Sequence, residues 1–497
     1  MDPVLAYHER TKHSYGSVRT GGHTLDWANE PSKFKRYLAG EPIPLPEPEP
    51  SGVAADQALE RSARGDGEGA VDLGRLSHLL FHAAGVVRTV RGAIGTFHFR
   101  TYASAGALYP NEVYVAAADV QGLEPGLYHY EPQEHRLRRL RDGDVRGALG
   151  LAGEPAGAIA VAVTGIPWRT AWKYTARGFR HLYWDAGMIV ANLLGAAGAL
   201  GVRARLVLGF VDERLDPALG VDGTTEFGLC VVTLGDGPAA EPTEVPALRL
   251  DVAPRSPGPP RDPAIEQARA AVALGDEAEV ERFRAAPVDR RAEEGPAVSL
   301  SPEQPSPRDG FERVVRRRGS SRRLARAAVP ASEFAAILAR ATAGVPADRA
   351  TGLVRALLVA NALDGLAPGA YAADGGFRLL REGDLRAQAG YLCLEQRLGA
   401  DAAATTFVIA DLEPIVAALG GRGYAAALLE AGVVAGRMYL GAYARCLGAS
   451  GITFYDDEVR SLFGTDAEPL IAVVVGEEGR RASIRRCRER LRDSSSV

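Results

Sequence analysis

The chain repeats one order of apolar and polar patterns. Continuous apolar runs at 158–163 and 406–410 are typical of buried strands. A long stretch rich in apolar, glycine and alanine residues follows each run and predicts helices over 179–200 and 424–447. Gly201 and Gly448 are expected to end these helices, because glycine commonly stops a helix. Each half is therefore predicted as helix, strand, hairpin, strand, long helix and strand.

Corresponding glycines indicate a duplication, because their numbers differ by nearly the same amount at widely spaced points. The pairs are Gly126 and Gly369 (243), Gly187 and Gly432 (245), and Gly220 and Gly464 (244). Two copies of this length predict two similar domains and not a solenoid, which needs more and shorter repeats. Small residues at helical spacing let helices approach closely, so we expect the two long helices to pair at a pseudo-two-fold axis. A compositional bias toward glycine and alanine is the alternative explanation.

Proline-rich stretches suggest five segments. They are an N-terminal extension with a Pro-rich linker (1–56), a first domain (57–236), a Pro/Ala-rich linker (237–308), a second domain (309–480) and a charged tail (481–497). One helix is expected in the second linker, over about 263–284, because its apolar residues share a face. The predicted fold class is α+β, with two antiparallel-rich sheets flanked by helices and fused as an intramolecular pseudo-dimer.

Composition excludes several kinds of function. The net charge of −4 gives no electrostatic support for binding nucleic acid or a membrane surface. The first residues lack the pattern of a signal peptide, and no uninterrupted apolar run reaches the roughly 18 residues of a membrane span. Four dispersed cysteines favour a cytoplasmic protein without a disulfide framework, and the nine histidines show no spacing typical of metal ligands.

Three short segments carry candidate chemistry. In the loop 100–110, small residues before a strand let backbone approach a flat ligand, although an ordinary turn has the same composition. Arg318, Ser320 and Arg322 alternate, so two guanidinium groups and a hydroxyl could face one phosphate; a solvated basic run is the alternative. Lys173 and Tyr174 occur together in the first half, where an amphipathic helix with a snorkelling lysine is the structural alternative.

Together these segments resemble the nitroreductase superfamily of flavoproteins, and within it the SagB/ThcOx-type azoline dehydrogenases. Residues 104–110 (SAGALYP) look like the family's flavin-ring loop, 318–322 (RGSSR) like its phosphate segment, and 172–174 (WKY) like the Lys-Tyr pair. The opening residues 7–14 (YHERTKHS) and 25–27 (LDW) are similar to the same subgroup. The resemblance implies FMN as cofactor, a modified peptide as substrate and a cyclodehydratase as partner.

The resemblance departs from the family pattern in complementary ways. The counterpart of the ring loop, 348–353 (DRATGL), has lost the Ser-Ala-Gly-Ala pattern, and the Lys-Tyr pair falls on Ala418 and Leu419 in the second half. In the first half, 10–14 (RTKHS) is only a distorted phosphate segment. Family dimers bind flavin between subunits, so we expect one FMN between the halves and an empty second site.

The resemblance assigns two groups of site residues. Lys173 is expected to act as general base and Tyr174 to assist, with the pair at a helix start or in a loop, because adjacent helical residues point about 100° apart. The residues expected to bind the cofactor are Arg100, Ser104, Ala105, Gly106, Leu108, Arg318, Ser320, Arg322, Thr453 and Arg480. No metal ligand is expected.

Three functions remain open from the sequence. The first is FMN-dependent oxidation of thiazoline or oxazoline rings in a peptide to azoles. The second is an NAD(P)H-dependent, nitroreductase-like reduction of a small molecule. The third is a non-catalytic scaffold in a peptide-modification complex.

Overall fold

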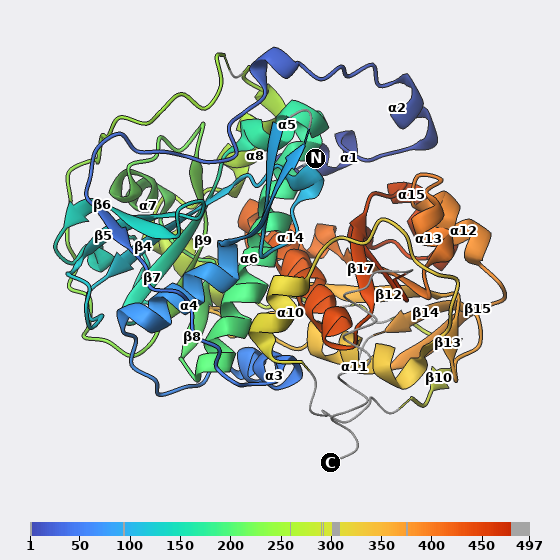
Figure 1. Cartoon of the computed structure of the whole chain (residues 1–497). Coiled ribbons are helices and arrows are strands. Elements are labelled where there is room, and N and C mark those ends of the chain that lie inside the picture. Colours follow the sequence, from blue (N-terminus) through green and yellow to red (C-terminus); the bar gives the residue numbers. More distant parts are fainter. Residues whose placement is uncertain are drawn as a thin grey trace.

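The computed structural model describes residues 2–92, 95–258, 260–289, 291, 293–300, 309–373 and 376–478. Within these ranges the chain forms two α+β halves, each built on a seven-stranded sheet in which neighbouring strands are antiparallel. The sheets lie on opposite sides of a central helix pair (Figure 1). The predicted fold class, a pseudo-dimer of two α+β domains within one chain, is confirmed.

The two sheets have the same topology. The first runs β1 (Pro42–Pro44), β6 (Arg136–Asp142), β5 (Gly126–Glu131), β4 (Asn111–Ala117), β7 (Ile159–Gly165), β9 (Phe227–Leu234) and β8 (Ala204–Val207). The second runs β10 (Ala297–Val298), β15 (Phe377–Glu382), β14 (Gly369–Ala373), β12 (Arg355–Ala360), β16 (Ala404–Ala410), β18 (Glu468–Gly476) and β17 (Gly448–Ile452). Two-stranded sheets are formed by β2 (Val86–Gly92) with β3 (Gly95–Arg100) and by β11 (Val329–Pro330) with β13 (Leu363–Asp364).

Helices surround both sheets. In the first half and the extension they are α1 (Pro3–Arg10), α2 (Tyr15–Thr20), α3 (Ala55–Arg64), α4 (Leu73–Ala84), α5 (Pro167–Tyr174), α6 (Gly178–Leu200) and α7 (Asp212–Leu219). The linker forms α8 (Pro263–Val272) and α9 (Glu277–Ala285). The second half contains α10 (Phe311–Arg317), α11 (Ala331–Ala341), α12 (Arg386–Leu392), α13 (Arg397–Asp401), α14 (Leu412–Ala444) and α15 (Asp456–Phe463).

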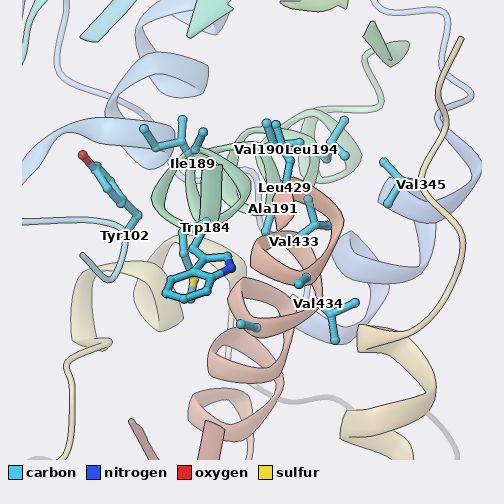
Figure 2. Close-up of a cluster of buried hydrophobic side chains, with 14 of the residues drawn as sticks. Tyr102, Trp184, Ile189, Val190, Ala191, Leu194, Val345, Leu429, Val433 and Val434 are labelled. Carbon is cyan, nitrogen blue, oxygen red and sulfur yellow. The ribbon is translucent and has the colours of Figure 1, made fainter. Parts of the chain in front are cut away.

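Helices α6 and α14 cross at the centre of the molecule (Figure 2). A Cβ atom added to Gly432 would lie 2.4 Å from the Trp184 carbonyl oxygen, and one added to Gly187 would lie 2.3 Å from that of Leu429. The backbones therefore touch where the duplicated glycines meet, and the predicted close pairing is confirmed. Apolar side chains of both helices, such as Ile189 and Val433, bury the surrounding surface.

Some predicted boundaries were wrong. Helix α14 begins at Leu412 and bends at Gly420, whose φ is 62°, so it starts a dozen residues before the expected 424. It ends at Ala444 with Arg445 as its cap, and Gly448 opens β17 instead of ending the helix. The single linker helix is two, because the chain turns extended at Ala273. Gly201 does end α6, in the left-handed conformation.

The N-terminal extension crosses both halves. The Tyr7 hydroxyl donates to the Ala176 carbonyl at 2.5 Å, whereas Lys12 forms an ion pair with Glu468 of the second half at 2.9 Å. Farther along, the Asp26 carbonyl accepts the indole N–H of Trp172 at 2.7 Å. The extension thus contacts Trp172, the residue before Lys173.

Two expectations about the whole chain can be compared with the described residues. Among their helices, α14 alone is long and apolar enough to cross a membrane, and its apolar window is completely buried by the rest of the protein, as in a core helix. Cys230 and Cys393 are buried free thiols.

Candidate active site between the halves

The ring loop is held in a strained shape by one buried carboxyl group. Gly106, Ala107 and Tyr109 all have positive φ values, of 61°, 54° and 48°, which costs free energy for the two residues that have a Cβ. Asp185 of α6 fixes the start of the loop: it accepts the Ser104 hydroxyl at 2.5 Å and the Ala105 N–H at 3.3 Å. The Ser104 oxygen in turn accepts the Tyr109 N–H at 2.9 Å.

Asp185 was not among the predicted site residues. Burial raises the pKa of its carboxyl to about 7, although its bonds to Ser104 and Ala105 lower it. The signal was present in the sequence, because Asp185 and Glu430 are acidic residues at equivalent positions in two mainly apolar helices.

Lys173 and Tyr174 lie against the ring loop. A Cβ atom on Gly106 would be 2.9 Å from the Tyr174 oxygen and 3.3 Å from Lys173 Nζ, so both polar atoms approach the same loop residue. The pair forms the last two residues of α5, not a helix start or a loop. Convergence is possible there because the long lysine side chain reaches past the helix end, where Thr175 has a φ of 50°.

The two side chains differ in environment. Lys173 is exposed, whereas Tyr174 is half-buried and stacks on His181 with ring centroids 4.3 Å apart. Burial, with the nearby Asp185 carboxyl, raises the pKa of Tyr174 to about 12. Tyr174 is therefore a hydrogen-bond donor at neutral pH, not a base.

Arg169, one helical turn before Lys173, anchors α5. Its buried guanidinium donates to the carbonyls of Tyr109 and Ser32 at 2.9 and 2.8 Å and forms an ion pair with Glu112 at 2.6 Å. Burial alone would raise the pKa of Glu112, but Arg169 beside it holds that pKa far below its usual range. Arg169 thus ties α5 to the end of the ring loop and to the extension.

The second half supplies the predicted phosphate segment. Arg318 donates to the carbonyls of Thr101, Arg100 and Tyr102 at 2.9, 2.8 and 3.0 Å, so this segment is fastened to the residues just before the ring loop. Ser320 and Arg322 are exposed beside it.

Tyr439 of α14, which the sequence did not single out, links the phosphate segment to the strand before Thr453. Its hydroxyl lies 3.1 Å from that of Ser320 and accepts the Gly451 N–H at 2.5 Å. Thr453 is half-buried just after β17. The structure therefore brings Ser104, Lys173, Arg318, Ser320 and Thr453 to one region between the halves.

The other residues predicted to bind the cofactor lie in different environments. Arg100 is buried, with its guanidinium 5.0 Å from the ring centroids of Phe34 and Tyr109, and it donates to the Lys33 carbonyl at 2.7 Å. These contacts give it a role in packing. Ala105 is half-buried in the ring loop and Leu108 is buried beneath it. Arg480 lies outside the described residues.

The cleft has polar atoms that suit a flavin. Tyr102 Oη, His181 Nδ1 and Trp184 Nε1 are buried without a hydrogen-bond partner among the described residues. Buried polar groups are normally paired, so such atoms are suited to a polar ligand. His181 stacks on Tyr174 and meets Trp184 at 4.7 Å, which places the atoms of His181 and Trp184 beside the Lys-Tyr pair. The residues present therefore fit a planar cofactor with hydrogen-bonding ring atoms.

The symmetry-related cleft is built differently. Glu430, the counterpart of Asp185, still holds the equivalent loop by accepting the N–H groups of Gly352 and Leu353 at 2.7 and 3.1 Å. Asp348 in that loop accepts the N–H of Gly209, the counterpart of Thr453, at 2.8 Å.

Linker helix α9 fills this second cleft. Arg284 donates to the Asp348 carboxylate at 2.9 Å and to the carbonyls of Gly209, Leu151 and Ala152 at 2.7 to 2.8 Å. Val280 and Phe283 of α9 are buried beside it. The second site is thus closed by protein.

The counterpart of the phosphate segment also proved to be elsewhere than expected. Ala204 of β8 and Ala449 of β17 are equivalent residues. Ala204 donates its N–H to the carbonyl of Gly65, just after α3, and Ala449 accepts the N–H of Ser321 in the phosphate segment. The residues after α3, with Asp66 where a cation would be needed, therefore take this place. The stretch 10–14 instead packs at the start of α6, where Thr11 accepts from Arg180 at 2.7 Å.

Comparison with known proteins agrees with this architecture. The model of the nitroreductase family matches residues 66–236 and 315–477, more than half of the chain. The chain therefore belongs to the nitroreductase family, carries two copies of its domain, and is an oxidoreductase by this membership.

Individual relatives extend over one or both halves. A nitroreductase of Methanocaldococcus jannaschii is 33% identical over 198 residues, which are 39% of this chain and 95% of that protein. The microcin B17-processing protein McbC of Escherichia coli is 28% identical over 153 residues, 28% of this chain and 54% of McbC. A nitroreductase structure from Anabaena variabilis has a TM-score of 0.76 at 25% identity and covers 96% of this chain and 99% of its own. These findings confirm the resemblance drawn from the motifs.

Proposed function

We propose that this protein is an FMN-dependent dehydrogenase that oxidises thiazoline or oxazoline rings of a modified peptide to azoles. The observation that carries the proposal is the convergence of Lys173 Nζ and Tyr174 Oη on Gly106 of the ring loop. The similarity to McbC, which processes microcin B17, supports a peptide substrate, and a cyclodehydratase that makes the azoline would be its partner.

The cofactor would lie between the halves. Residues 104–108 and Thr453 would border its ring, and Ser320, Arg322 and the free end of Arg318 would face its phosphate. FMN supplies the hydride acceptor for this chemistry. One such site is expected in each chain, because α9 fills the other cleft.

The protein would supply position and proton transfer. The reaction removes two hydrogens from the ring, one as a proton from the carbon beside the carbonyl and one as a hydride. Lys173 would take the proton at Nζ as general base. Tyr174, which remains protonated, would donate a hydrogen bond that orients the substrate carbonyl. Asp185 and Arg169 would keep the ring loop and α5 in place. Dioxygen would then accept the two electrons.

Anaerobic mixing of the purified protein with a thiazoline-containing peptide tests the proposal. We expect loss of the visible absorbance of oxidised flavin and formation of one azole for each flavin reduced. A colourless protein that binds no added FMN would contradict it and favour a scaffold.

A second candidate is reduction of a small molecule with NAD(P)H, which the relative from Methanocaldococcus jannaschii favours. Rapid bleaching of the flavin by NADPH, with no bleaching by the azoline peptide, would support this alternative.

A further inference from the structure

A pocket of about 250 Å³ lies beside the ring loop. Its walls come from the extension, strand β3 and the ring loop; they are Glu30, Pro31, Lys33, Phe34, Thr96, Phe97, His98, Phe99 and Ala107. Ala107 directly follows Gly106, the residue that Lys173 and Tyr174 approach. The pocket is therefore one residue away from the candidate reaction centre.

The lining of the pocket suits a flat group. Complete small-molecule sites usually enclose about 300–1,000 Å³, so this slightly smaller space has room for a flat side chain or heterocycle. Phe34 meets His98 edge to face at 5.2 Å, and Phe97 is 37% exposed. Aromatic walls of this kind favour flat apolar groups.

The pocket runs along a strand edge. Successive residues of a strand point to opposite faces, so a pocket lined by the four consecutive residues 96–99 must follow the backbone of β3 and not one face. Among the described residues β3 pairs only with β2, through contacts such as Phe97 with Val90, so its other edge has no strand partner. Such an edge can bind an extended peptide through main-chain hydrogen bonds.

We infer that the edge of β3 binds the peptide substrate as an added strand, with a flat side chain or neighbouring azole in this pocket. The inference rests on the proposed function. An extended chain advances about 3.3 Å per residue, so the group in the pocket would belong to a residue close in sequence to the azoline at Lys173. Rings already oxidised, or aromatic residues next to the azoline, are the chemistry this pocket recognises.

The test uses the intact holoenzyme with two substrates. One is a peptide with a single thiazoline, in which the two residues before the ring and the two residues after it are phenylalanine. The other is the same thiazoline capped as an acetyl methylamide. Phe97→Ala should raise KM for the peptide roughly tenfold, about 1.4 kcal/mol, with little change in kcat. Its activity on the capped ring should match the wild type. Val90→Ala, on the paired strand and 41% exposed, is the matched control and should leave both substrates unaffected.

The outcomes separate the two ideas. If the wild type oxidises both substrates and Phe97→Ala keeps the wild-type KM for the peptide, the pocket does not bind substrate and the proposed function stands. Equal losses on peptide and capped ring would also overturn the inference, because they indicate damage to the reaction centre. If the wild type oxidises neither substrate, the proposed function fails and the inference fails with it.

Discussion

The two clefts between the halves share one structural element but differ in the residues that occupy them. In both, an acidic residue of the central helix holds the loop before the sheet: Asp185 binds Ser104, and Glu430 binds Gly352. The first cleft adds the Lys173-Tyr174 pair. The second instead receives Arg284 of α9, which pairs with Asp348. The shared carboxyl group is therefore part of the scaffold, and the two clefts differ in the residues that surround it.

The comparison also shows why the halves depend on each other. The ring loop belongs to the first half, but Arg318 of the second half holds the three carbonyls that precede it. A fused pair can keep one complete site and convert the other to packing, because the two copies evolve within a single chain.

The largest effect is expected from removing the candidate base of the first cleft. Lys173→Ala should lower azole formation about 10²–10⁴-fold, the usual contribution of a general base, with FMN still bound. Turnover with the azoline peptide measures the loss. Ala418→Lys places a lysine at the counterpart position and should neither change the wild-type rate nor rescue Lys173→Ala. Wild-type turnover by Lys173→Ala would refute the role of Lys173.

Opening the second cleft should cost stability but not activity. Arg284→Ala leaves the Asp348 carboxylate, whose side chain is fully buried, without its cation. We expect the free energy of unfolding to fall by about 3 kcal/mol in denaturant titrations, with one FMN still bound per chain. Arg282→Ala on the same helix is the control, because that side chain is 69% exposed and should matter by less than about 0.5 kcal/mol. Equal stabilities of the two variants would show that α9 does not seal the cleft.

The buried Asp185 carboxyl should make stability depend on pH. Its pKa is raised from 3.8 to about 7, so the folded state holds a proton that the unfolded state loses. Its contribution is complete below pH 3.8 and is lost as the pH rises to 7, at up to about 1.4 kcal/mol per pH unit. The difference in unfolding free energy between wild type and Asp185→Asn should show this slope.

Ser104→Ala is the informative control for that slope. It keeps the carboxyl and removes a hydrogen bond that lowers the pKa of Asp185, so the slope should persist and extend to higher pH. A slope that survives in Asp185→Asn would assign it to another group.

The weakest expected effect is at the junction between the halves. The planar guanidinium of Arg318 donates to three carbonyls, and Arg318→Lys replaces it by a single ammonium group. We expect FMN affinity to fall about tenfold in fluorescence titrations, because the segment before the ring loop loses donors. Arg64→Lys, at the exposed end of α3 in the first half, should leave the affinity unchanged. Identical affinities for Arg318→Lys and wild type would show that the contacts of Arg318 with the first half do not contribute to FMN binding.

Much of the site could be predicted because its signals are local. The ring loop, the Lys-Tyr pair and the phosphate segment are short motifs, and the duplicated glycines marked the contact of α6 with α14. The residues that organise the site were missed because they act over long separations: Asp185 is 81 residues from Ser104, and Arg169 is 60 residues from Tyr109. The aromatic neighbours of Arg100, Phe34 and Tyr109, could not be predicted either, because they are brought to it by the fold.

The sequence by itself determined the two α+β halves, the small-residue helix contact and the presence of the Lys-Tyr pair in one half, because apolar periodicity and local spacing encode these features. Only the tertiary structure decided that Lys173 and Tyr174 converge on Gly106, that Asp185 holds the ring loop and that α9 fills the second cleft. The physical reason is that burial, ion pairing and convergence of side chains depend on which distant segments the fold places together.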